Sequence, residues 1–396
     1  MRPNPTSEVH APQKPASLFV LILMSSITFI AILSEMVPAG ILTHISEGLN
    51  ISEAAAGQMV GIYALASAIC AIPLVTATMK YNRKTLLLWL LAGFAISNIA
   101  VGFSSNYYLT LGMRIIGGVA AGILWAMITA YGMMLVPENQ HGRAIAIIMA
   151  GNTLGVSLGM PLMTWIGNTF NWRTEFYALG TLIILIGILC AIFLPSTPGE
   201  KVTKANNPFA LLKNKYVLII LLLTLLGVMA HYASYTYITK IVESIALPGG
   251  IETALILFGI GSFASVMAAV KFTDTSLRMF TTIMFALGAL GLAALWLFPG
   301  IQWICYAGFL IWGISFGPLV TMLQAAVAKH SPTAKAIATS LQSSMFNFSI
   351  MFATSMGGAL ISGVNGNIQH VLIASVALLI PATLISLVSK HTLGQK

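Results

Sequence analysis

Residues 17–42 read SLFVLILMSSITFIAILSEMVPAGIL, an apolar stretch long enough to cross a bilayer as a helix. Basic residues precede it, as they do in a signal peptide. The stretch is longer than a signal-peptide core, however, it carries Glu35 and Pro38, and it has no A-x-A cleavage pattern. We therefore expect a retained membrane helix that holds one acidic side chain.

Similar apolar stretches follow along the whole chain, each bounded by polar, Gly or Pro clusters. With 58% hydrophobic and 7% charged residues, the composition excludes a soluble globular domain. The predicted spans are residues 17–42, 55–79, 84–103, 107–136, 142–168, 174–194, 215–246, 251–272, 277–298, 301–328, 333–363 and 367–390. We predict an all-α membrane protein whose twelve transmembrane helices form two pseudo-symmetric halves of six.

The positive charges occupy every second gap between these spans. Sixteen of the nineteen basic residues follow this rule, namely Arg2, Lys14, Lys80, Arg83, Lys84, Arg143, Lys201, Lys204, Lys213, Lys215, Lys271, Arg278, Lys329, Lys335, Lys390 and Lys396. By the positive-inside rule, both termini and the even-numbered loops are expected in the cytoplasm. Membrane lipids, rather than nucleic acid, are the expected partners of this charge.

The longest hydrophilic stretch, residues 195–215, separates spans six and seven. We expect a cytoplasmic tail at 1–16, a six-helix bundle at 17–194, a cytoplasmic linker at 195–215, a second bundle at 216–390 and a tail at 391–396. Short strings recur with an offset near 195: residues 143–146 resemble 335–338, and the Gly pair 118/122 resembles 313/317. Parallel six-helix repeats are typical of secondary transporters with a substrate site at mid-membrane.

Three acidic, basic or histidine side chains lie well inside the predicted spans, away from their ends: Glu35, Arg114 and His231. Such groups are costly in a bilayer and indicate function by default. Glu35 and Arg114 lie at similar predicted depths, so they could pair, and the repeat offset places His231 at the position that matches Glu35. A carboxyl group and an imidazole suit proton coupling. The alternatives are that Glu35 caps a helix break, that Arg114 binds backbone carbonyls, and that His231 is a hydrogen-bonded core residue.

Aromatic and amide side chains inside the spans are candidates for binding a substrate. These are Trp125, Tyr232, Tyr235, Asn152, Gln324, Gln342 and Asn347. The amides could equally join helices to one another. In span five, Gly155, Gly159 and Pro161 favour close helix packing and a kink, which could serve packing alone or a hinge.

No reactive or ligand-binding string accompanies these groups. Cys70, Cys190 and Cys305 lie in apolar stretches without metal-ligand spacing. There is no catalytic triad order, no HExxH and no phosphate-binding G-x-x-x-x-G-K-[ST]. We expect no enzyme activity, no cofactor and no metal.

Several strings resemble the major facilitator superfamily, specifically its bacterial drug:H+ antiporter family with the sugar-efflux and purine nucleoside-efflux branches. They are 34–40 in span one, Arg114 with Gly118 and Gly122, the antiporter-like Gly155, Gly159 and Pro161, Asn171-Trp172-Arg173, and Ala230-His231-Tyr232. Arg83 and Lys84 match the basic pair of the family's loop after span two. Met79 and Asn82 stand where the family usually has Asp and Gly.

The resemblance implies a monomer in the bacterial inner membrane that exports small organic solutes in exchange for protons. Sugars or nucleosides are the expected substrates, with amphipathic drugs as an alternative. An importer or facilitator of the same fold is the competing function. Glu35, Arg114 and His231, as ionisable groups inside the spans, are expected to couple protons, and by resemblance Gly155, Gly159, Pro161, Arg83 and Lys84 are expected to control conformation.

Overall fold

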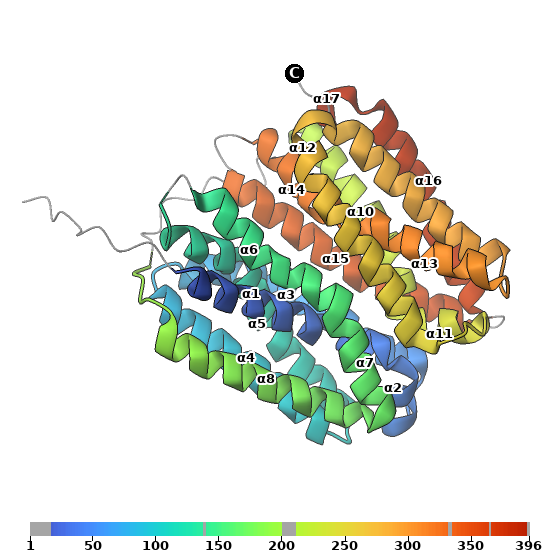
Figure 1. Ribbon diagram of the computed structural model, residues 1–396, viewed down its shortest axis with the longest axis horizontal. Coiled ribbons are helices and arrows are strands. Elements are labelled where there is room, and N and C mark those ends of the chain that lie inside the picture. Colours follow the sequence, from blue (N-terminus) through green and yellow to red (C-terminus); the bar gives the residue numbers. More distant parts are fainter. Residues whose placement is uncertain (1–16, 138–139, 200–210, 332–334, 364–365, 394–396) are drawn as a thin grey trace, which may run out of the picture.

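The computed structural model describes residues 17–137, 140–199, 211–331, 335–363 and 366–393, and their regular structure is helical (Figure 1). The first half holds α1 (Leu18–Gly40), α2 (Leu42–Leu49), α3 (Glu53–Thr78), α4 (Arg83–Phe103), α5 (Tyr107–Met134), α6 (His141–Leu154), the π-helix η2 (Gly155–Gly159), α7 (Met160–Thr169) and α8 (Trp172–Phe193). The second half holds α10 (Lys215–Thr236), α11 (Ile238–Ser244), α12 (Gly250–Leu297), α13 (Gln302–Phe316), α14 (Leu319–Lys329), α15 (Lys335–Ser362), α16 (Ile368–Val388) and α17 (Lys390–Leu393).

Twelve segments of the described chain are long and apolar enough to cross a membrane, which confirms the predicted number. The fifth span combines α6, η2 and α7, and the tenth combines α13 and α14. Spans eight and nine, Gly250–Ala269 and Leu277–Leu297, belong to one continuous helix, α12, where the sequence pattern predicts a loop between them. No Gly or Pro lies between Gly261 and Gly288, so the sequence holds no strong helix breaker there.

The first helix of each half breaks in the same way. Helix α1 ends before Ile41 (φ −129°, ψ 28°), and α10 ends before Tyr237 (φ −109°, ψ 26°). After each break a short helix follows, α2 in the first half and α11 in the second. The two breaks are 196 residues apart, which agrees with the repeat offset seen in the sequence. We call the end of the bundle that carries these short helices the α2/α11 end.

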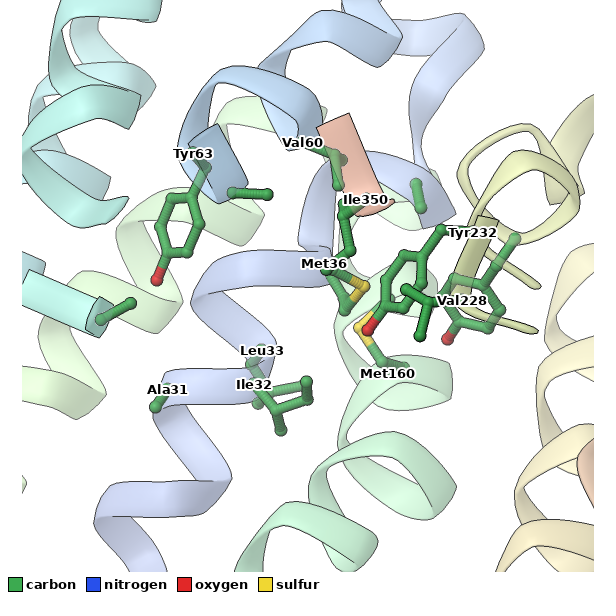
Figure 2. Close-up of a cluster of buried hydrophobic side chains, with 14 of the residues drawn as sticks. Ala31, Ile32, Leu33, Met36, Val60, Tyr63, Met160, Val228, Tyr232 and Ile350 are labelled. Atoms are coloured by element: carbon green, nitrogen blue, oxygen red, sulfur yellow. The ribbon is translucent and has the colours of Figure 1, made fainter. Parts of the chain in front are cut away.

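The two halves meet along α3 and α15, with further contacts of α1 on α10 and α11 and of α7 on α12. Figure 2 shows the centre of this interface, where Met36 and Met160 of the first half lie beside Val228, Tyr232 and Ile350 of the second. These side chains are all nearly inaccessible to solvent. Apolar packing therefore fills the middle of the contact between the halves.

Span five lies against α1 through its glycines. A Cβ on Gly151 would collide with the backbone of Ser25, and one on Gly155 would collide with Ile32. The backbone widens into the π-helix η2 just before Pro161, whose ring nitrogen cannot donate a helical hydrogen bond. The close helix packing predicted from these glycines is present. The backbone departs from the α-helix next to Pro161, where the sequence favours a kink.

This packing makes a stability prediction. Gly151→Ala should lower the free energy of unfolding by about 1–3 kcal/mol, because the added methyl overpacks a backbone contact. Gly112→Ala is the matched control, because nothing lies within 4 Å of its added Cβ. The control should be neutral or stabilising by up to about 1 kcal/mol, since Ala favours helix. Thermal unfolding in detergent measures both, and equal melting temperatures for the two variants would contradict the packing.

Candidate functional site

The guanidinium group of Arg114 on α5 is fully buried, with 0% of the residue exposed. Its Nε donates to the carbonyl of Met59 at 2.9 Å, and Nη2 donates to the carbonyl of Glu35 at 2.8 Å. Nη1 donates to the carbonyl of Ser34. The group also lies 4.2 Å from the ring centroid of Tyr63. Arg114 therefore joins α1, α3 and α5 by hydrogen bonds that are all to backbone oxygens.

Pro38 explains why a carbonyl of α1 is available to Arg114. In an α-helix the carbonyl of Ser34 would accept from the backbone nitrogen four residues later, which here belongs to Pro38. Proline has no N–H, so this carbonyl loses its helical partner inside the bilayer. A buried carbonyl without a partner is costly, and the arginine supplies the missing donor.

The carboxyl group of Glu35 lies inside the bundle and is separate from this carbonyl network. Its side chain is 4% exposed, and its Oε1 has no hydrogen-bond partner among the described residues. The indole of Trp125 lies within hydrogen-bonding range of the carboxyl group, and Arg114 and Tyr63 act on it electrostatically. Of the alternatives for Arg114, the structure shows the one in which it binds backbone carbonyls.

A short polar chain continues from Glu35 into α4. The side-chain amide of Asn98 donates to the hydroxyl of Ser34 at 2.6 Å and to the carbonyl of Phe94 at 2.9 Å. The hydroxyl of Tyr63 lies close to the same serine. These residues fix the backbone of α1 at the position of Glu35.

His231 lies in an aromatic cluster of the second half. Its ring stacks on Phe316 with a centroid distance of 3.4 Å and an angle of 9°, and on Tyr235 at 5.2 Å. Phe258 and Trp312 complete the cluster. Phe316 is the last residue of α13, directly before the Gly-Pro break that separates α13 from α14.

Three polar atoms of this aromatic cluster have no hydrogen-bond partner within the described part of the chain. They are Nδ1 of His231, the hydroxyl of Tyr235 and Nε1 of Trp312. The repeat offset predicts that Glu35 and His231 face each other across a central cavity. Instead, it is Tyr232, the residue next to His231, that lies within electrostatic range of Glu35.

The other predicted binding residues divide between helix contacts and partly exposed positions. Gln342 is fully buried, and its Nε2 lies 3.5 Å from the hydroxyl of Thr224 on α10. Asn347 donates to the carbonyl of Ser343 in its own helix. Trp125, Asn152 and Gln324 are partly exposed.

The loop that carries Arg83 and Lys84 is fixed at the start of α4 by Asn82 and by the backbone of Arg83. Asn82 caps this helix by accepting from the backbone of Lys84 at 3.0 Å, and its amide donates to Ser196 at 2.7 Å. The backbone nitrogen of Arg83 donates to the carbonyl of Thr197 at 2.9 Å. Asn82, which departs from the family pattern, thus ties this loop to the segment after α8.

Polar contacts join the two halves at the α2/α11 end. Lys240 of α11 binds Glu53 of α3 at 2.9 Å and Glu243 at 2.6 Å, and Thr43 of α2 donates to Glu243 at 3.1 Å. Asn168 of α7 donates to Glu252 of α12 at 2.7 Å. Two helices near the opposite end pack within their own halves. Helix α14 packs against helices of the second half, and α5 packs against α1, α3, α4 and α6 of the first half.

Sequence reasoning missed several of these groups. Tyr63 and Phe316 carry no charge, so nothing in their local sequence distinguished them from core aromatics. Lys240 lies near the end of a predicted span, and nothing in the local sequence indicated its contact with Glu53 across the halves. Glu175, at the edge of predicted span six, is fully buried. Its position just inside the predicted span 174–194 was the sequence signal that could have identified Glu175 as a buried acid.

The link between Pro38 and Arg114 can be tested by a double-mutant cycle. Arg114→Lys should destabilise the protein by about 3–5 kcal/mol. An ammonium group cannot keep all three carbonyl contacts, so buried carbonyl oxygens would lose their hydrogen-bond donor. In a Pro38→Ala background the cost should fall by about 1 kcal/mol, because the alanine that replaces Pro38 returns a backbone N–H donor to Ser34. Urea or thermal unfolding of the four proteins checks this, and strictly additive effects would refute the link.

Solved structures share this arrangement. A variant of the nucleoside transporter NupG matches with a TM-score of 0.73 at 13% identity, covering 93% of this chain and 99% of that one. A bacterial homolog of the human lysosomal transporter Spinster, in an inward-facing and occupied conformation, matches with a TM-score of 0.73 at 16% identity, covering 96% and 98%. At these identities the likeness shows the fold alone.

Sequence relatives extend the comparison. A probable sugar efflux transporter of Mannheimia succiniciproducens is 29% identical over 368 residues, which cover 90% of this chain and 89% of the relative. A protein of the same description from Helicobacter pylori is 28% identical over 341 residues, covering 85% and 87%. The sequence pattern of the Major Facilitator Superfamily matches residues 24–354. With twelve spans, this fold and this pattern, the chain belongs to the Major Facilitator Superfamily of membrane transporters.

Proposed function

We propose that this transporter exports small polar solutes, with sugars as the leading class, in exchange for protons. The observation that carries the proposal is the carboxyl group of Glu35. It lies inside the bundle, where its Oε1 has no hydrogen-bond partner among the described residues, and it is within reach of Trp125 of the first half and Tyr232 of the second. The relatives described as probable sugar efflux transporters favour export over import.

Burial supports a change of protonation at Glu35. Burying a carboxylate costs several kcal/mol, and the nearby Arg114 and Trp125 offset only part of that cost, so Glu35 holds a proton more readily in the closed site than in water. When the site hydrates, Glu35 can ionise and release its proton. If solute and proton bind at the same place in turn, export of one requires entry of the other.

The α2/α11 end is the side that we propose faces out of the cell. Basic residues gather in the loops at the opposite end, which by the positive-inside rule is cytoplasmic. Polar contacts between the halves at the α2/α11 end then close the outward path in this conformation. Rocking of the halves about the apolar contact near Met36 would open it and close the other end.

Glu35→Gln tests the proposal directly. Because glutamine keeps the size of the side chain but cannot bind and release a proton, the variant should lose sugar transport driven by a pH gradient in proteoliposomes. Exchange of sugar for sugar at equal pH should remain. Glu47→Gln, which removes an exposed acid of α2, is the matched control and should transport normally.

Unchanged gradient-driven transport in Glu35→Gln would remove this residue from proton coupling. Reversing the pH gradient separates the exporter from an importer, since the two accumulate solute on opposite sides. Repeating the assay with nucleosides and with cationic drugs separates the substrate classes.

The ion pairs of Lys240 with Glu53 and Glu243 give a second prediction. Although partial burial lowers the pKa of Lys240, the hydrogen bonds that it donates to Glu243 and Glu53 and the charges of these two residues outweigh burial and raise this pKa above its ordinary value of 10.5. Because the pKa is raised, charged Lys240 stabilises the closed α2/α11 end fully at pH values below the ordinary value of 10.5, and this contribution is lost as the pH rises above it.

Lys240→Gln should therefore favour opening of the α2/α11 end by about 0.5–1 kcal/mol, the usual range for a partly exposed ion pair. Spin-label distances between α2 and α11 should lengthen in the variant, and in the wild type they should not change between about pH 6 and 9. Identical distance distributions for variant and wild type would show that the ion pairs do not hold this end closed.

A further inference from the structure

A second buried acid lies on α8, away from Glu35. Glu175 is 0% exposed. Its Oε2 lies so near α7 that a Cβ added to Gly167 would come within 2.5 Å of it, and the same Cβ would come within 2.7 Å of Ile41. Ile41 follows Glu35 by six residues, about 9 Å along a helix at 1.5 Å per residue. Glu175 therefore lies toward the α2/α11 end, where α1, α7 and α8 meet.

Neither carboxyl oxygen of Glu175 has a hydrogen-bond partner in the described chain. Helix α7 has no titratable side chain, and the elements that pack around the site contribute Glu35 on α1, His44 and Glu47 on α2, and Arg173 on α8, with Arg83 and Lys84 at the far end of α4. None of these acts on Glu175 electrostatically. Arg173 is turned to the ring of Trp172 and the carbonyl of Ser104.

Magnitudes decide the protonation state. Glu175 is in the first turn of α8, where the helix dipole gives a negative charge a small stabilisation. Burying a carboxylate without a partner costs several times more than the dipole returns. Burial outweighs the dipole, so the neutral acid is the stable form in this conformation.

The helix that covers Glu175 is linked to the second half. Helix α7 follows the π-helix η2 and is joined to the second half through Asn168 and Glu252. Thr164, one turn before Gly167 on α7, is also fully buried, and its hydroxyl has no partner within the described residues. A shift of α7 with the second half would uncover two unpaired polar groups together and admit water to both.

We propose that Glu175 is a second proton-binding carboxyl group of this transporter, covered by α7 in the present conformation and uncovered when α7 moves away from α1 and α8. Covered, it holds one proton as the neutral acid. Uncovered, it releases that proton to water as a carboxylate, and it rebinds one before α7 closes again. The link to transport rests on the proposed function, whereas the protonation of the covered acid does not.

Infrared spectroscopy of the purified protein in lipid tests the proton directly. Wild type at neutral pH should show the carbonyl band of a protonated carboxyl group that Glu175→Gln lacks and that the control Glu47→Gln retains. Gly167→Ala retains the carboxyl group of Glu175, but its added methyl group contacts Oε2. This variant should therefore shift the same band without removing it. A wild-type spectrum that Glu175→Gln does not change, or a band that Gly167→Ala leaves unshifted, would overturn the assignment.

Transport in proteoliposomes tests the link to movement. Glu175→Gln should keep sugar exchange at equal pH but change the dependence of gradient-driven export on the pH at the α2/α11 side. An unchanged pH profile would overturn the link. The two proposals fail separately: normal transport in Glu35→Gln would contradict the proposed function, whereas the infrared band would still report on Glu175.

Discussion

The guanidinium group of Arg114, bound to backbone carbonyls of α1 and α3, is the interaction on which the rest of this structure depends. A proline in the last turn of α1 removes one helical donor in a region where water cannot replace it. The arginine on α5 restores the donor, and in doing so it fixes α1, α3 and α5 against one another. Because the hydrogen bonds of the arginine go to carbonyls, the carboxyl group of Glu35 is left free of them.

Because Arg114 binds carbonyl groups and not the carboxyl group of Glu35, this carboxyl group can gain and lose a proton. A carboxylate paired with a buried arginine would be held charged, whereas an unpaired carboxyl group can change its protonation state when its surroundings become wet. Trp125 and Tyr232 place an indole and a phenol of opposite halves near the same group. A relative movement of the halves therefore changes the environment of the acid directly.

The contacts between the halves are of two kinds. In the middle they are apolar and close, around Met36 and Tyr232, and such packing tolerates a rocking movement because it has no directional bonds to break. At the α2/α11 end they are directional, with the ion pairs of Lys240 and the hydrogen bond of Asn168 to Glu252. Exposed ion pairs are individually weak, so this end can open without a large cost.

The sequence by itself determined the number of spans, their approximate limits and the internal repeat, because apolar length and helix-breaking residues are local properties. It also singled out Glu35, Arg114 and His231, because ionisable groups are rare in apolar stretches. It did not determine their partners. Whether Arg114 meets the carboxyl group or the carbonyl groups of α1, whether His231 faces Glu35 or stacks on Phe316, and whether Glu175 lies at a surface or under α7 all depend on how distant helices are rotated and packed. Only the tertiary structure decided these contacts, because a difference of a few ångströms between helices far apart in the chain leaves no trace in local composition or periodicity.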